Sequence, residues 1–341
     1  MVSAIVIYIT AFFVPLLLSL VVLPFHIRFM KKKKIVGTDI HKESQPKVAE
    51  MGGIIILLTM IIGSVIAIFI VSNPSDKLTI GIFCITITIA GIIGLIDDFK
   101  PLSAIIKPIL LLFASIPIIV SKRYISEPML PFVGKMRLNI VYLALLPFVV
   151  SIPANAVNML DVFNGSMATT SMLVLVAIAI ASGLIFGFNF TELNLTYVFL
   201  LITLGALLAF WFFNRYPAKV FAGDTGSLTI GAAIGTIAVL GQLEIVVIIA
   251  MIPFIMNAFG TLSSVKGLVE RRKMPARPTS MTEDWKLQAN PDPKAPITLV
   301  GIVLQKGPLR EDDVVKSFNI LTILSCILAI VTAVLIKVTI K

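Results

Sequence analysis

The sequence predicts an all-α, polytopic membrane protein. The chain has 341 residues, of which 58% are hydrophobic and only 13% are charged. A soluble domain carries about a quarter charged residues and slightly under half apolar ones. The mean hydropathy of +1.03 agrees with this excess of apolar residues. Soluble, disordered and fibrous classes are excluded, because only a bilayer accommodates so much apolar surface.

Ten segments are apolar enough to be read as membrane spans, since about 20 apolar residues cross a bilayer. They are 4–24, 52–71, 78–96, 104–120, 139–152, 167–187, 196–213, 227–240, 245–262 and 318–338. The first is read as a retained helix and not a cleaved signal peptide, because Arg28 and Lys31–Lys34 follow it and no basic residue precedes it. Segments 139–152 and 227–240 are the shortest. Cys84 and Cys326 lie in apolar segments and are interpreted as core residues.

The distribution of positive charge predicts the orientation. Three quarters of the 28 Lys and Arg residues lie in the odd-numbered loops. The positive-inside rule places those loops in the cytoplasm and both termini outside. Loop 4 (122–137) carries four basic residues on the opposite side. We expect one integral-membrane domain over 1–341, in which the polar loop 9 (266–316) forms a cytoplasmic subregion.

Four polar clusters follow odd-numbered spans, so all four are predicted to face the cytoplasm. They are Asp97-Asp98, the run of Asn155, Asn158, Asp161 and Asn164, the turn around Asp224, and Arg271-Arg272-Lys273. Each has an ordinary explanation: a solvated acid pair, helix caps, a tight turn, or charges that set orientation. All four clusters lie on the same predicted side of the membrane, and a single shared site explains this better than four separate causes.

The residue types indicate the chemistry of that site. Carboxylate and amide oxygens without His or Cys suit Mg²⁺ or Mn²⁺, and Mg²⁺ is usually held by one or two carboxylates plus substrate phosphates. Pro101 ends the helix that carries Asp97, so the chain can fold back and bring Lys107 to the acids. The alternative is a lysine that snorkels to the interface. Metal and basic residues at a membrane surface indicate a diphosphate substrate and phosphoryl transfer.

Three motifs resemble the polyprenyl-phosphate N-acetylhexosamine-1-phosphate transferases, a family of the glycosyltransferase 4 type. They are Gly94-Leu-Ile-Asp-Asp-Phe99, Asn155-Ala-Val-Asn158 through Asn164-Gly165, and Phe221-Ala-Gly-Asp-Thr-Gly226. Within the family, the chain is most similar to archaeal and eukaryotic UDP-GlcNAc:dolichyl-phosphate GlcNAc-1-phosphate transferases. The similarity to them includes Arg271-Arg-Lys-Met-Pro275 and the segment from Lys47 to Gly53.

The resemblance implies a role for each site residue. Asp224 and Asn158 would be the Mg²⁺ ligands, and Asp97, Asp98 and Lys107 the catalytic group at the lipid phosphate. Phe221 would stack on the uracil and Asn164 would bond its edge. The remaining substrate-binding residues would be Glu50, Asn155, Asp161, Arg271, Arg272 and Lys273. Pro101 stands where the family has a third acid, so that acid is not essential here. Arg272 replaces a His that is common in eukaryotic members.

The implied reaction is transfer of GlcNAc 1-phosphate from UDP-GlcNAc to dolichyl or polyprenyl phosphate, with release of UMP, as the first step of lipid-linked oligosaccharide assembly. The expected location is the plasma membrane of an archaeon, or the endoplasmic reticulum of a eukaryote. A second copy of the chain is a candidate partner, and no nucleic acid is expected. The alternatives are another UDP-N-acetylhexosamine donor or, in a different class, a polyprenyl-lipid transporter. A transporter would carry charges near the bilayer midplane, whereas these acids lie at span ends.

Overall fold

The computed structural model describes residues 3–269 and 273–340 and is almost entirely helical. Eight helices in these residues are long and apolar enough to cross a membrane. They are α1 (Ala4–Lys32), α2 (Gly53–Ile70), α3 (Pro74–Phe99), α6 (Ile140–Leu160), α7 (Ser166–Phe186), α8 (Leu195–Asn214), α9 (Gly223–Leu240) and α13 (Glu311–Ile340). The prediction of an all-α polytopic membrane protein is therefore confirmed.

The other two predicted spans are interrupted or short. Helices α10 (Glu244–Ala250) and α11 (Ile252–Ser264) are bent by 68° at their junction. A shorter apolar helix consists of α4 (Ile106–Leu112), the 3₁₀ turn η1 (Phe113–Ser115) and α5 (Ile116–Ser121). Each of the ten predicted segments thus falls on helix, but only eight are single helices of full spanning length within the described residues.

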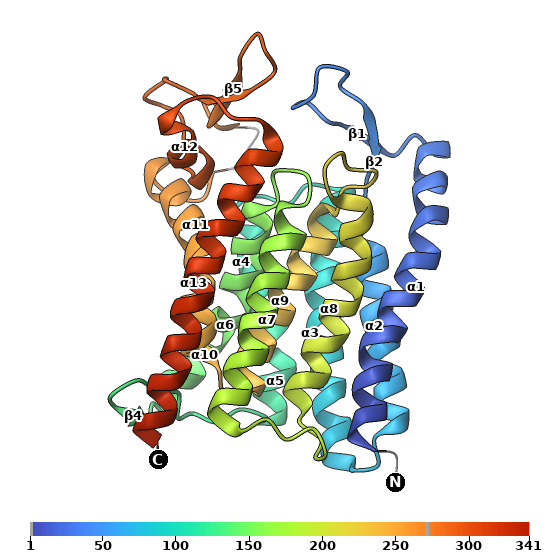
Figure 1. The fold of residues 1–341 in the computed structure, drawn as a ribbon, viewed down its shortest axis with the longest axis vertical. Coiled ribbons are helices and arrows are strands. Elements are labelled where there is room, and N and C mark those ends of the chain that lie inside the picture. Colours follow the sequence, from blue (N-terminus) through green and yellow to red (C-terminus); the bar gives the residue numbers. More distant parts are fainter. Residues whose placement is uncertain (1–2, 270–272, 341) are drawn as a thin grey trace.

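The loops carry small elements at both ends of the bundle. They are the hairpins β1 (Val36–Thr38) with β2 (Lys47–Ala49), β3 (Met129–Leu130) with β4 (Gly134–Lys135) and β5 (Thr279–Met281) with β6 (Leu287–Ala289), then α12 (Leu299–Val303) and the 3₁₀ turn η3 (Leu304–Lys306). Both termini lie at one end, whereas β1, β2, β5 and α12 lie at the other (Figure 1). The two termini are therefore on the same side of the bundle.

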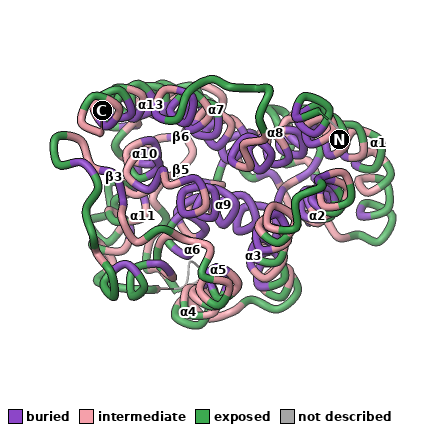
Figure 2. The backbone as a smooth tube through the Cα atoms, turned by 90° about the horizontal axis from the view of Figure 1, so that it is seen from below, coloured by how far each residue is buried: buried purple, intermediate pink, exposed green. Residues whose placement is uncertain are grey.

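Helix α9 is the central helix of the bundle (Figure 2). Its most apolar window is 83% buried, the largest share among the eight helices, and has the lowest mean hydropathy, 1.3. A helix that contacts protein on all sides does not need a lipid-facing apolar surface, and small residues let neighbours approach closely. The low hydropathy at its start explains why the predicted span, 227–240, is too short. Helix α9 starts at Gly223 and includes Asp224 in its first turn.

Helix α6 also differs from its predicted bounds. The segment 139–152 was expected to end before Pro153, but α6 continues through Pro147 and Pro153 to Leu160. Proline is tolerated in membrane helices where neighbouring helices satisfy the freed backbone groups. Asn155 and Asn158 consequently lie on the last turns of α6, whereas the predicted span ended before them.

Close packing of α3 against α9 depends on Gly94. A Cβ atom at this position would lie 2.5 Å from the backbone oxygen of Asp224. We expect Gly94→Ala to lower the free energy of unfolding by about 1–3 kcal/mol, since the overpacked helices must separate. The measurement is the thermal unfolding midpoint in detergent. Gly81→Ala, on the same helix, is the matched control, because a Cβ at Gly81 would meet nothing within 4 Å.

Gly81→Ala should leave the midpoint unchanged or slightly raised, because Ala has the higher helix propensity by about 1 kcal/mol. Equal midpoints for the two variants would contradict the importance of the α3–α9 approach at Gly94.

Candidate active site

Four predicted site residues meet at one end of the bundle, around the ammonium group of Lys107. Lys107 Nζ lies 2.9 Å from Asp97 Oδ2 and 3.4 Å from Asn158 Oδ1, and it also donates to Asp224 Oδ2. Asn158 Nδ2 donates to Asp224 Oδ1 at 2.8 Å. Residues from α3, α4, α6 and α9 thus form one hydrogen-bonded group, which we call the Lys107 cluster (Asp97, Lys107, Asn158 and Asp224).

The chain reverses between Asp97 and Lys107 as the sequence predicted. Helix α3 ends at Phe99, the segment with Pro101 is not helical, and α4 begins at Ile106. Asp97 Oδ1 accepts a hydrogen bond of 2.5 Å from the backbone N–H of Leu102, which fixes this reversal. The prediction that Pro101 lets Lys107 return to the acids is therefore confirmed.

Asp98 does not belong to the Lys107 cluster but caps α9. Its two carboxylate oxygens accept from the backbone N–H of Asp224 at 2.7 Å, and from the N–H and hydroxyl of Thr225 at 3.0 and 2.6 Å. A carboxylate at a helix N-terminus satisfies free N–H groups and interacts favourably with the helix dipole. Gly223, at φ +69°, lies so close that a Cβ there would be 2.7 Å from Asp98 Oδ1. Asp98 therefore positions Asp224.

Charge in this region is unbalanced. Asp97, Asp98 and Asp224 bring three carboxylates together, whereas Lys107 is the only cation that pairs with them in the described part of the chain. The side chains of Asp97 and Lys107 are 11% and 18% exposed, so solvent compensates little of the charge. The site therefore favours an additional cation.

Asn155 and Asp161 flank Asn158 at the end of α6. Asn155 donates to the backbone oxygen of Ser151 at 2.9 Å, and the Ser151 hydroxyl reaches the Pro108 oxygen of α4 at 3.3 Å. Asp161, the residue that ends α6, is half-buried beside the cluster. Burial raises the pKa of its carboxyl to about 7, with a further contribution from the negative charges of Asp224 and Asp98.

Asp161 should make stability depend on pH. A raised pKa means that the folded protein holds a proton which the unfolded chain releases near its ordinary value of 3.8. The contribution of Asp161 to stability is therefore present at low pH and is lost as pH rises from about 4 to 7. We expect Asp161→Asn to flatten the decline in thermal midpoint over this window. A midpoint profile with the same slope in the variant would contradict the raised pKa.

The hairpin of loop 1 places Glu50 and Phe221 next to each other. The backbone N–H of Phe221 donates to the Ala49 oxygen at 2.8 Å, and Gly52 N–H donates to the Phe221 oxygen at 2.8 Å. A Cβ on Gly37 would lie 2.6 Å from Glu50 Oε1 and 3.3 Å from the Phe221 ring. Burial, and the charge of Asp98, raise the pKa of the Glu50 carboxyl.

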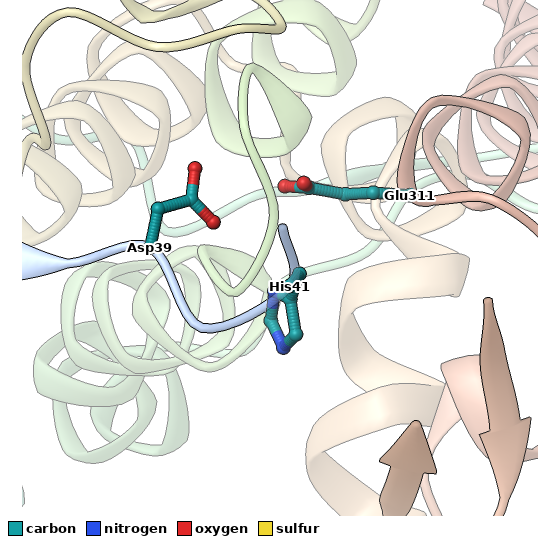
Figure 3. Close-up of side chains that lie close together, drawn as sticks. All are labelled: Asp39, His41 and Glu311. Carbon is teal, nitrogen blue, oxygen red and sulfur yellow. The ribbon is translucent and has the colours of Figure 1, made fainter. Parts of the chain in front are cut away.

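Asn164 lies in a second polar group, which we call the loop clasp (Asp39, Lys42, Asn164 and Glu311). Its side-chain nitrogen donates to Asp39 Oδ2 at 2.9 Å and to Glu311 Oε1 at 2.6 Å, and its backbone N–H donates to Glu311 Oε1 at 2.7 Å. Lys42 pairs with both carboxylates. Figure 3 shows Glu311 extending toward Asp39, with His41 beside them. The clasp ties together the segment between β1 and β2, the turn between α6 and α7, and the start of α13.

Sequence reasoning missed Asp39, Lys42 and Glu311. The only signal was that a few acids occur in polar loops on the predicted cytoplasmic side, which does not select a partner. Asp39, His41 and Glu311 offer ligand atoms within 4.8 Å of one another. Lys42 pairs with both carboxylates and offsets one of their two negative charges. This grouping alone carries no metal assignment. The uracil contact of Asn164 stays a prediction.

The basic motif of loop 9 lies mostly beyond the described residues. Arg271 and Arg272 fall outside them, so their predicted contact with the diphosphate stays a prediction. Lys273 is described and its side chain is exposed. The subregion 266–316 contains the β5–β6 hairpin and α12.

Comparisons with known proteins identify the family. The model of glycosyl transferase family 4 matches residues 80–242, which include the whole Lys107 cluster. A Saccharolobus solfataricus protein named as a UDP-N-acetylglucosamine–dolichyl-phosphate N-acetylglucosaminephosphotransferase is 33% identical over 235 residues, 68% of this chain and 70% of that protein. A Clostridium novyi protein named phospho-N-acetylmuramoyl-pentapeptide-transferase is 30% identical over 334 residues, 93% of each chain. This chain is therefore a multi-pass membrane transferase that belongs to glycosyl transferase family 4.

Proposed function

We propose that this protein transfers GlcNAc 1-phosphate from UDP-GlcNAc to dolichyl or polyprenyl phosphate and releases UMP. The observation that carries the proposal is the Lys107 cluster, in which carboxylates, an amide and an ammonium group converge at one end of the bundle. Beside it, Phe99, Ile105 and Ile109 expose 69%, 57% and 49% of their surface. An apolar surface next to a phosphate-binding lysine suits a lipid phosphate.

The donor set is suited to Mg²⁺, with Mn²⁺ as an alternative. The carboxylates of Asp224 and Asp97 and the amide oxygen of Asn158 are hard oxygen ligands, and no Cys or His lies among them. Asp224 and Asn158 would hold the ion. When bound, it would neutralise the diphosphate and stabilise the charge that develops on the UMP phosphate.

The transfer breaks one phosphorus–oxygen bond and forms another. An oxygen of the lipid phosphate attacks the β-phosphorus of UDP-GlcNAc, and the bond from that phosphorus to the bridging oxygen breaks, so that UMP leaves with the electron pair. Lys107 lowers the repulsion between the two anions. Holding both substrates in line would contribute further, on the order of 7–11 kcal/mol in ideal intramolecular reactions.

The contacts of Asp97 and Asp98 favour direct attack by the lipid phosphate over a route through a covalent aspartyl intermediate. Both oxygens of Asp98 accept hydrogen bonds from the start of α9, so a covalent bond to Asp98 would disrupt that cap. Asp97 accepts from Lys107 and from the Leu102 backbone, which suits a group that orients Lys107. We infer that these two acids position other groups at the site.

The competing donor is UDP-MurNAc-pentapeptide, because the Clostridium novyi relative named phospho-N-acetylmuramoyl-pentapeptide-transferase aligns over 93% of this chain. The family resemblance implies a His-rich motif in the last cytoplasmic loop of bacterial members. This chain has only His26 and His41, both before α2, which favours UDP-GlcNAc.

The test gives the purified protein Mg²⁺, dolichyl phosphate and either UDP-[³H]GlcNAc or UDP-MurNAc-pentapeptide, and measures lipid-phase product and UMP. We expect label in the lipid phase with UDP-GlcNAc, blocked by EDTA and by tunicamycin. Product with UDP-MurNAc-pentapeptide alone would overturn the donor assignment. If no UMP is released with either donor, the proposed reaction is overturned.

A further inference from the structure

A second site lies at the end of the bundle opposite to the Lys107 cluster. Asp224 stands in the first turn of α9, whereas Val239 and Leu240, in its last turn, line a cavity of about 270 Å³. The start of α3, through Thr79, and the segment that follows α5 complete the walls. A helix of this length separates the two sites by about 25 Å.

The polar lining of this cavity consists mainly of basic groups. Lys122 and Arg123 contribute two positive charges and Gln242 an amide, whereas the Thr79 hydroxyl already donates to the Ser75 backbone oxygen at 3.0 Å. No acid lines the cavity, and among the described residues neither basic group forms an ion pair. The cavity therefore attracts an anion.

Arg123 is held in place by a hydrogen bond, whereas the side chain of Lys122 is exposed. Arg123 Nη1 donates to the Ser75 hydroxyl at 2.6 Å, which leaves the other guanidinium N–H groups available. Lys122 ends α5 at φ +54°, a conformation that is uncommon for residues other than glycine. Glu127, the acid nearest in loop 4, pairs instead with Arg137 at 3.1 Å. The positive charge at the cavity is thus not compensated from within loop 4.

The surroundings of the cavity indicate a lipid. Ile125 lines it and is 46% exposed, and Tyr124, also in the lining, stacks on Tyr142 with ring centroids 5.7 Å apart. Tyrosine, basic groups and exposed apolar residues at the end of membrane helices are typical of the membrane–water interface. Basic pockets between membrane helices bind the head groups of anionic lipids.

We propose that this cavity binds the phosphate of an anionic membrane phospholipid, with Lys122 and Arg123 on the phosphate and the acyl chains along Ile125. The four basic residues of loop 4 oppose the charge asymmetry of the chain. Two of them are then explained as ligands and two, Lys135 and Arg137, are not. Arg137 pairs with Glu127, so Lys135 and Lys337, at the same end of the bundle, supply the matched control.

The test compares the double variant Lys122→Gln/Arg123→Gln with Lys135→Gln/Lys337→Gln, which makes the same change in charge outside the cavity and leaves the Glu127–Arg137 pair intact. Delipidated full-length protein is titrated with phosphatidylglycerol, phosphatidylcholine or inorganic phosphate. Bound lipid is counted by native mass spectrometry and thermal midpoints are recorded. We expect one tight phosphatidylglycerol in the wild type and the control, and affinity weakened at least about 10-fold in the cavity variant.

The outcomes separate the possible sources of the phosphate. Stabilisation by phosphatidylglycerol that exceeds stabilisation by phosphatidylcholine supports an anionic lipid. Equal effects of the two lipids, or inorganic phosphate that competes fully with phosphatidylglycerol, would overturn the lipid assignment. Equal losses of lipid in the two double variants would overturn the site itself, since positive charge at this end of the bundle would then act without regard to position. Failure of the proposed transfer reaction would leave these binding results unaffected.

Discussion

Replacing Asp224 by Asn is expected to reduce transfer by about 10³-fold while the protein stays folded. The substitution removes one of the two carboxylates that pair with Lys107, and with it the proposed charged ligand of Mg²⁺. Losing one preorganised electrostatic group at a reacting phosphate or carbonyl typically costs about 10²–10³ in rate, and loss of a metal ligand adds to this. The measurement is the rate of UMP release at saturating UDP-GlcNAc.

The fold should survive because Asp98 caps α9 through the backbone N–H of residue 224, which Asn retains. The thermal midpoint of Asp224→Asn is therefore expected within a few degrees of the wild type. Asp76→Asn, at the opposite end of α3, is the matched control and should leave the rate unchanged. Activity in Asp224→Asn above half that of the wild type would remove Asp224 from the metal assignment.

The sequence was sufficient to predict the Lys107 cluster because local rules specify it. Pro101 cannot continue α3, so the direction of the chain changes at a known residue. Charged side chains at span ends are confined to two planes, so Asp97 and Asp224 have few places to lie. Only part of the Asn/Asp run reaches this cluster, because Asn158 lies on the last turn of α6 whereas Asn164 lies beyond it in the loop clasp.

The orientation of Asp98 and the loop clasp could not be predicted without the three-dimensional structure. Asp98 is adjacent to Asp97 and has the same chemistry, but it faces the N-terminus of α9, and the direction of a side chain at a helix end is set by the neighbouring helix. The loop clasp joins Asp39, Asn164 and Glu311 across 125 and 147 residues of sequence. No periodic pattern encodes such a contact, because each partner lies in an irregular segment or a first helical turn.

The second large effect is expected at Lys107, where Lys107→Met should reduce transfer by about 10²–10³-fold. Without the ammonium group, the carboxylates of Asp97 and Asp224 lose their positive partner. The substrate anions then meet uncompensated negative charge. Lys107→Arg should recover only part of the rate, since a planar guanidinium cannot reproduce a point charge shared by three acceptors. Lys100→Met, an exposed lysine just after α3, is the control and should keep wild-type activity.

A double-mutant cycle distinguishes an ammonium group that acts together with Asp97 from one that acts alone. If Asp97 works by orienting Lys107, adding Asp97→Asn to Lys107→Met should cost little beyond the single lysine variant. Losses that multiply would instead assign Asp97 a separate role at the lipid phosphate. Unchanged kinetics in Lys107→Met would return Lys107 to a lysine that only snorkels to the interface, and the fold-back at Pro101 would then serve packing alone.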